Sequence, residues 1–110
     1  MPVISFKESS SLYNFLINNS NTSIVIDFSA SWCSPCKHMT PIFLNYSNKR
    51  NDLIFIKLMH GEFENDPDNP FFKYDITSLP TFILLKNNIE VKRVIGADEE
   101  ELKELVFLEA

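Results

Sequence analysis

Hydrophobic runs alternate along the chain with segments whose apolar residues recur at helical spacing. Three runs are apolar at nearly every position, a pattern typical of strands buried on both faces of a sheet. They span 23–29, 53–59 and 81–86. A shorter run, 2–6, predicts an N-terminal strand. The segment 89–95 predicts a strand that pairs back after a tight turn at Asn87-Asn88.

Helical periodicity marks the segments between and after these runs. Segments 9–18 and 33–49 each carry an apolar face, and Pro41 is expected to kink the second helix. The apolar positions are Leu12, Phe15, Leu16, Met39, Ile42, Phe43 and Tyr46. A short helix is predicted at 70–74. The last helix is predicted to start at Asp98, because a glutamate three residues later completes a capping box.

The predicted element order is β-α-β-α-β-(short α)-β-β-α, which defines an α/β protein with a mixed sheet. A length of 110 residues suits one domain, 1–110, with one core. The net charge of -5 argues against nucleic acid as a partner. No apolar stretch approaches the roughly 20 residues that span a bilayer, and the N-terminus lacks a secretory signal pattern. A cytoplasmic location without membrane attachment is therefore expected.

The chain contains two cysteines, Cys33 and Cys36, directly after the run 23–29. A helix that begins at about Cys33 would direct unpaired backbone N–H groups at its sulfur, and their partial positive charge favours a thiolate. Pro35 fits the first helical turn, where its missing N–H has no cost. Cys36 lies one turn further in, where it could attack a mixed disulfide formed on Cys33. This arrangement predicts thiol–disulfide exchange.

Three other interpretations of the cysteine pair compete with redox chemistry. A structural disulfide would close only a small loop and is disfavoured in a reducing compartment. Zinc usually needs four ligands, and His38 and His60 stand at no familiar zinc spacing from the cysteines, so no metal site is expected. Coincidence is disfavoured by the strand-turn-helix context. Redox chemistry is the favoured interpretation.

Two charged residues interrupt the apolar runs. Asp27 stands between Ile26 and Phe28, where burial would raise the pKa of its carboxyl group. A buried Asp27 beneath the cysteines could accept a proton from Cys36. The alternative interpretation is that Asp27 lies at the end of its strand and faces solvent. Lys57, within the second run, is a candidate charge partner of Asp27 or an edge residue whose ammonium group lies in solvent.

A proline stands at the mouth of the third run, in Ser78-Leu79-Pro80-Thr81. Such a proline is either a plain loop residue or a cis residue in a tight turn. The sequence pattern alone leaves both options open.

Together these residues resemble the thioredoxin family over nearly the whole chain, from about Ile4 to the end. The similar positions are the segment 25–37 with its Trp-Cys-Ser-Pro-Cys-Lys motif, Pro41, Lys57, Leu79-Pro80-Thr81-Phe82 and Gly96. The resemblance implies a three-layer sandwich in which about four helices flank a mixed sheet of about five strands.

The resemblance also implies a role for each site residue. Cys33 would be the exposed attacking thiolate, and Cys36 would be the resolving thiol. Asp27 would assist Cys36, with Lys57 beside it, and these four residues form the expected catalytic set. Pro80 would be cis. The docking surface for a partner would consist of Trp32, Pro35, Leu79, Pro80 and Gly96.

Membership of this family would imply protein disulfides as substrates and an external flavin- and NADPH-dependent reductase as electron donor. It would also imply a monomer without a bound cofactor. The expected activity is protein-disulfide reduction through Cys33 and Cys36, in electron transport and cell redox homeostasis. A more oxidising, isomerase-like enzyme and a non-catalytic adaptor are the alternatives. The adaptor is disfavoured, since it has no chemical need for Asp27, both cysteines and Pro80 together.

Several positions depart from the usual family pattern. Ser34 replaces a glycine between the cysteines, where the residue type tunes the reduction potential. Ser29 replaces a common tryptophan, and Ser78-Leu79 replaces a glycine followed by isoleucine or valine. The acidic loop 60–70 is about four residues longer than usual. This loop is interpreted as inert surface, with selection of basic partners as the alternative.

Overall fold

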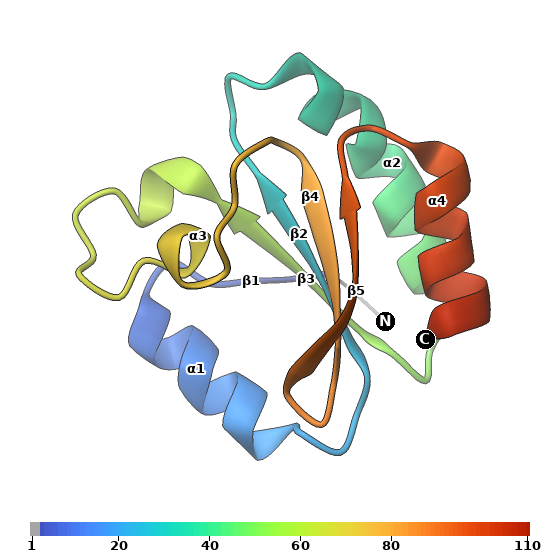
Figure 1. The fold of residues 1–110 in the computed structure, drawn as a ribbon, viewed down its shortest axis with the longest axis horizontal. Coiled ribbons are helices and arrows are strands. Elements are labelled where there is room, and N and C mark those ends of the chain that lie inside the picture. The colour runs from blue at the N-terminus through green and yellow to red at the C-terminus, as the bar shows by residue number, and fades with distance from the viewer. Residues whose placement is uncertain (1–2) are drawn as a thin grey trace.

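A computed structural model describes residues 3–110 and contains a five-stranded sheet with the strand order β1-β3-β2-β4-β5 (Figure 1). The strands are β1 (Ile4–Ser5), β2 (Ile24–Ser29), β3 (Ile54–Met59), β4 (Thr81–Lys86) and β5 (Ile89–Ile95). β1, β3 and β2 are parallel, whereas β4 pairs antiparallel with both β2 and β5. The predicted α/β class with a mixed sheet is confirmed.

The helices cover both faces of this sheet. They are α1 (Ser9–Asn18), α2 (Ser34–Lys49), α3 (Pro70–Lys73) and α4 (Glu99–Glu104), with a 3₁₀ turn at His60–Glu62 and a π-helical turn at Leu105–Glu109. Figure 1 shows α1 and α3 on one side of the sheet and α2 and α4 on the other. In the described part of the chain, no helix has the length and apolar character needed to cross a membrane.

Two apolar clusters fill the spaces between these layers. Leu12 of α1 and Phe71 of α3 pack in the first cluster, and Phe43 of α2 and Leu102 of α4 pack in the second. All four side chains are 3% exposed or less, so both faces of the central strands are shielded from water. This explains why the runs that form those strands are apolar without alternation.

β2 is buried along its whole length, and its side chains alternate between the two clusters. Ile26 and Phe28 belong to the cluster under α1 and α3, whereas Val25 belongs to the cluster under α2 and α4. Because alternate residues of a strand share a face, Asp27 points to the same side as Val25, toward α2. The sheet therefore directs this carboxyl group at the helix that carries the cysteines.

Two predicted signals at the ends of elements are confirmed. Asn87 and Asn88 adopt φ values of 53° and 60° in the β4–β5 turn, a conformation that asparagine tolerates better than most residues. Asp98 is the N-cap of α4, where its Oδ1 accepts the Glu101 N–H at 3.0 Å. Pro41 lies inside α2, which continues to Lys49.

Other boundaries differ from the sequence prediction. β1 is limited to Ile4–Ser5, since it pairs only with Ile56 and Lys57 at the edge of the sheet. Pro2 of the predicted strand 2–6 lies outside the described residues. The loop 60–70 begins with a 3₁₀ turn, and the last helix changes to π-helical geometry at Leu105.

Candidate active site around a disulfide

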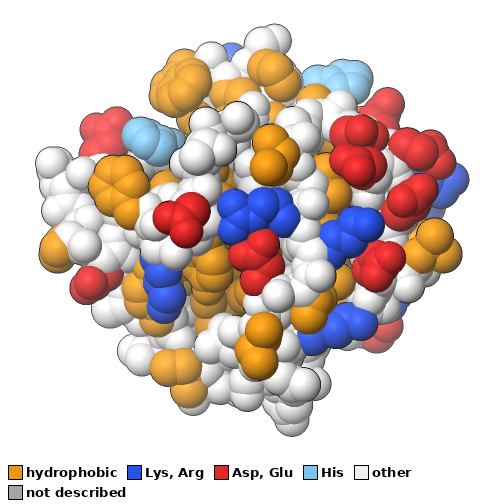
Figure 2. Space-filling model, in the orientation of Figure 1, with side chains coloured by type: hydrophobic (Ala, Val, Ile, Leu, Met, Phe, Trp, Pro, Cys, Tyr) orange, Lys and Arg blue, Asp and Glu red, His pale blue; other side chains and the backbone are white. Residues whose placement is uncertain are grey.

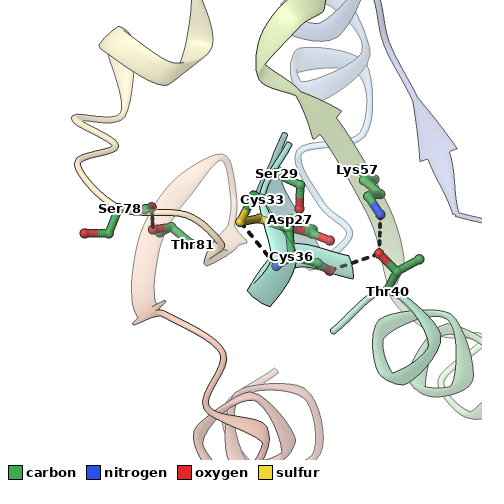
Figure 3. The surroundings of a disulfide bond; sticks show 8 residues. All are labelled: Asp27, Ser29, Cys33, Cys36, Thr40, Lys57, Ser78 and Thr81. Carbon is green, nitrogen blue, oxygen red and sulfur yellow. Dashed lines mark hydrogen bonds between the residues drawn. A yellow bond between two sulfur atoms is a disulfide. The ribbon is translucent and has the colours of Figure 1, made fainter. Parts of the chain in front are cut away.

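Cys33 and Cys36 are joined by a disulfide at the point where β2 leads into α2 (Figure 3). Cys33 is the N-cap of α2, and its Sγ accepts the Cys36 N–H at 3.3 Å. Pro35 lies in the first turn, as predicted. A backbone N–H at the positive end of a helix therefore points at the Cys33 sulfur, which is the arrangement that favours a thiolate after reduction.

The two cysteines differ in their access to the surface. Cys33 lines an open hollow of about 520 Å³, whereas Cys36 does not. Their exposed fractions are small, 6% for Cys33 and 2% for Cys36, so the expected exposure of Cys33 is limited to this hollow. Cys33 is therefore accessible from the hollow, whereas Cys36 is not.

Asp27 is fully buried on the side of β2 that faces α2. Burial raises the pKa of its carboxyl group to about 6, although a hydrogen bond from Ser29 and the charge of Lys57 both lower it. The Ser29 hydroxyl donates to Asp27 Oδ1 at 2.5 Å, while Oδ2 has no hydrogen-bond partner among the described residues. The predicted rise in pKa is confirmed, and the solvent-facing alternative for Asp27 is wrong.

Lys57 lies directly opposite Asp27 in the β2–β3 register. It is not at the sheet edge, because β3 is flanked by β1 and β2. Its Nζ donates to Thr40 Oγ1 at 2.6 Å, and the Thr40 hydroxyl donates to the Cys36 carbonyl at 3.1 Å (Figure 3). Among the described residues Lys57 forms no ion pair within 4.0 Å. Its effect on Asp27 is therefore electrostatic and does not involve direct contact.

The Leu79–Pro80 peptide bond is cis, so the conformation implied by the family resemblance is confirmed. Leu79 packs against the cluster formed by Ala30 and the two cysteines, and it lines the hollow. The Pro80 carbonyl accepts the Gly96 N–H at 2.8 Å, and Gly96 has a φ of 94°, which favours glycine. Strand β4 thus begins directly beside the disulfide.

The predicted docking residues fall into two groups. Trp32, Pro35 and Leu79 line the hollow, and Trp32 is 70% exposed. Pro80 is buried and Gly96 half-buried, and neither lines the hollow. The roles of these residues in binding a partner stay predictions.

The hollow also contains residues that the sequence analysis did not select. Phe72 is 76% exposed at its rim, and Phe71 and His60 form part of its lining. The His60 ring lies 5.2 Å from the Phe71 ring and 6.3 Å from the Trp32 ring, measured between centroids. The adjacent pair Phe71-Phe72 was the available signal, since neighbouring helical residues point about 100° apart. Here Phe71 faces the core and Phe72 faces outward.

The acidic part of the loop 60–70 lies outside the hollow, because Glu62 and Glu64 do not line it. Selection of basic partners by this loop stays a prediction. Among the described residues, no group of three or more His, Cys, Asp or Glu side chains is placed to hold a metal ion.

Comparison with known proteins identifies the family. The family model for thioredoxin matches residues 3–107. Thioredoxin H2 of Arabidopsis thaliana is 41% identical over 90 residues, which are 82% of this chain and 65% of that protein. The chain therefore belongs to the thioredoxin family. Its matched part spans slightly less than two thirds of the length of this relative.

Solved structures of thioredoxins have the same fold. The reduced thioredoxin pre-protein of Schistosoma mansoni gives a TM-score of 0.86 at 33% identity, and the match covers 96% of each chain. A thioredoxin from Nicotiana alata gives a TM-score of 0.83 at 36% identity, covering 96% of this chain and 92% of the other. The three-layer thioredoxin fold implied by the sequence is confirmed.

Proposed function

We propose that this protein is a thiol–disulfide oxidoreductase that reduces disulfides of other proteins through Cys33 and Cys36. One observation carries the proposal: the Cys33 sulfur lies both at the start of α2 and in the wall of an open hollow. Cys36 lies behind it, on the helix toward which the buried Asp27 points. In this arrangement Cys33 is the group that contacts the partner, whereas Cys36 and Asp27 complete the exchange from inside the protein.

The first step is attack by the Cys33 thiolate on one sulfur of a partner disulfide. A mixed disulfide forms between Cys33 and the partner, the partner S–S bond breaks, and the released partner thiolate takes a proton from water. The N–H at the start of α2 stabilises the attacking thiolate. Once a partner covers the hollow, its apolar lining residues, including Trp32 and Leu79, keep water away from the reacting sulfurs.

The second step releases the partner. The Cys36 thiol transfers its proton to the Asp27 carboxylate, directly or through water, and attacks the Cys33 sulfur. The Cys33–Cys36 disulfide forms and the second partner thiolate leaves, taking up a proton. In total the partner gains two electrons and two protons, and the cysteine pair becomes oxidised. A carboxyl group with a pKa of about 6 suits this transfer, because it is mainly ionised at neutral pH and still basic.

The return to the dithiol needs an external reductant. We propose a flavin- and NADPH-dependent reductase as this electron donor, which makes the protein an electron carrier in cell redox homeostasis. We also propose a monomer in the cytoplasm. Both cysteines of the sequence belong to the redox pair, so the chain carries none of the additional disulfides that stabilise many secreted domains.

An insulin-reduction assay with dithiothreitol tests the proposed function. The wild type should accelerate precipitation of the insulin chains, and Cys33→Ser should reduce the rate to that of dithiothreitol alone. Cys36→Ser should instead accumulate a mixed disulfide, detectable by mass spectrometry. Equal rates for the wild type and Cys33→Ser would contradict the proposal and favour a non-catalytic adaptor.

Asp27→Asn tests the proton acceptor. Because asparagine accepts no proton, resolution of the mixed disulfide should slow by about 10²-fold or more at neutral pH. Single-turnover kinetics at increasing pH should recover part of this rate, because Cys36 then ionises without help. A rate equal to that of the wild type at every pH would contradict this role.

A further inference from the structure

The ammonium group of Lys57 and the carboxylate of Asp27 are neighbours that do not pair. The two residues lie opposite each other in the β2–β3 register, and both fall on the face covered by α2. Asp27 is fully buried and Lys57 is half-buried. A buried carboxylate normally makes direct contact with a neighbouring ammonium group, since the opposite charge lowers the cost of burying it. Here the Lys57 ammonium makes its hydrogen bond to Thr40 instead.

Thr40 uses its hydroxyl group in two directions at once. Its Oγ1 accepts the Lys57 ammonium at 2.6 Å and donates its proton to the Cys36 carbonyl at 3.1 Å. A hydroxyl has one proton to donate, so this proton is committed to the helix backbone and the lone pairs face the ammonium. Because Thr40 lies one turn after Cys36 on α2, the helix fixes where Lys57 is held.

Asp27 is left with a neutral partner. Its Oδ1 accepts the Ser29 hydroxyl, and its fully buried Oδ2 has no hydrogen-bond partner among the described residues. A buried carboxylate oxygen without a partner carries a desolvation cost that a bound proton removes. Oδ2 is therefore the oxygen of Asp27 at which a proton is best held.

We propose that Thr40 is a positioning residue whose hydroxyl holds the Lys57 ammonium away from the Asp27 carboxylate. The benefit of this arrangement depends on the proposed function: it keeps the Asp27 carboxylate basic enough to accept the proton of Cys36. When it is held at Thr40, the Lys57 ammonium still offsets part of the negative charge of the Asp27 carboxylate. In direct contact with Asp27, it would stabilise the ionised carboxylate and make it a poor proton acceptor.

The other groups around Asp27 do not duplicate the effect of Lys57. In the register of the neighbouring strand β4, Phe82 stands opposite Asp27 and carries no charge. From α2 and its N-cap, the titratable groups at the site are the thiols of Cys36 and Cys33, and these exist only after the disulfide is reduced. Lys37 and His38 also belong to α2, but neither contributes to the shift of the Asp27 pKa. In the oxidised protein, Lys57 is the charged group whose movement would change the titration of Asp27.

The test is a titration of the Asp27 carboxyl carbon by ¹³C NMR in the oxidised protein. In Thr40→Val, which keeps the shape of threonine but lacks its hydroxyl, Lys57 is free to approach Asp27. The Asp27 pKa should then fall from about 6 by about one pH unit or more. Thr40→Ser keeps the hydroxyl and should titrate like the wild type. An unchanged or raised midpoint in Thr40→Val would overturn the proposal.

A second pair of variants shows that the effect passes through Lys57. Lys57→Met should raise the Asp27 pKa, and adding Thr40→Val to it should produce no further change. A further fall in the double variant would contradict the proposal, since Thr40 would then act on Asp27 by another route. The titration needs no enzymatic turnover, so its failure is distinguishable from failure of the proposed reductase activity in the insulin assay.

Discussion

At the scale of single residues, the buried Asp27 carboxyl group makes folding stability depend on pH. Its pKa rises from 3.8 to about 6 on folding, chiefly because burial disfavours the charged form. The protonated carboxyl group therefore contributes stability that is fully present below pH 3.8 and is lost as the pH rises through about 6. The loss corresponds to about 3 kcal/mol of unfolding free energy.

We expect Asp27→Asn to remove this loss. The free energy of unfolding of the oxidised protein should increase by up to about 3 kcal/mol at about pH 8, and change little at about pH 4, where Asp27 is largely protonated. Urea unfolding of both proteins at a series of pH values measures the difference. A gain that is equal at all pH values would mean that packing, and not ionisation, explains it.

Ser29 acts on the same carboxyl group in the opposite direction. Its hydroxyl donates to Asp27 Oδ1 and so stabilises the ionised form. Ser29→Ala should raise the Asp27 pKa above its value of about 6, by up to about one pH unit. Carboxyl ¹³C NMR of the oxidised protein measures this change. Ser29→Thr keeps the hydroxyl and serves as the control, and a lower midpoint in Ser29→Ala would contradict the assignment.

At the scale of elements, α4 depends on its N-cap. Asp98 Oδ1 accepts the Glu101 N–H at 3.0 Å, and this helix has only six residues before its geometry changes. Asp98→Ala should lower the free energy of unfolding by about 1 kcal/mol, because an N–H of the first turn loses its acceptor. Urea unfolding measures the effect. Asp98→Asn caps equally well and should be close to the wild type, and equal losses in both variants would exclude capping as the cause.

Local signals explain which elements the sequence predicted. Asp98 and the pair Asn87-Asn88 act within a few residues of themselves, so their structures were predictable from spacing and backbone preference. The position of Cys33 at the start of α2 was predictable for the same reason. The cis bond at Pro80 was not, because both isomers fit the local pattern and only the family resemblance favoured one.

Interactions between distant segments explain what the sequence analysis missed. Lys57 meets Thr40, 17 residues away, where the sheet packs against α2. The predicted proximity of Lys57 to Asp27 agrees with the strand register, in which the two residues lie opposite each other. The hydrogen bond from Lys57 to Thr40 was not predicted, because no spacing rule relates a lysine in a strand to a threonine in a helix. The exposed position of Phe72 likewise depends on how α3 sits beside the disulfide.

At the scale of the whole molecule, the hollow beside the disulfide differs in composition from the acidic surface over α4. Figure 2 shows acidic side chains gathered over α4, where Glu99, Glu100 and Glu101 form the first turn. The hollow beside the disulfide is lined by aromatic, aliphatic and small polar residues, together with His60. Contact with a partner at this hollow therefore depends on apolar burial more than on the net charge of the protein.

Phe72 is 76% exposed at the hollow and takes no part in the proposed exchange between the sulfur atoms. Phe72→Ser should raise the KM for insulin about fivefold, which corresponds to about 1 kcal/mol of lost contact. Reaction with a small aromatic disulfide, which does not reach the rim, should be unchanged. Both rates are measurable with the same enzyme preparation.

Leu108 supplies the matched control for this prediction. It is 78% exposed, similar to Phe72, but it lies in the C-terminal π-helical turn and does not line the hollow. Leu108→Ser should therefore leave the KM for insulin at the wild-type value. Equal changes in both variants would indicate a general effect of surface apolarity and contradict a local docking surface at Phe72.

Trp32 is the one tryptophan of the sequence, and it stands at the rim of the hollow beside Cys33. Its indole can be excited beyond the absorption of tyrosine, so the emitted light comes from this position alone. Formation of the neighbouring disulfide should quench the Trp32 emission, and binding of a peptide at the hollow should shift the emission wavelength. The unlabelled protein thus carries its own optical sensor, with which binding and electron transfer can be followed as separate events in a stopped-flow instrument.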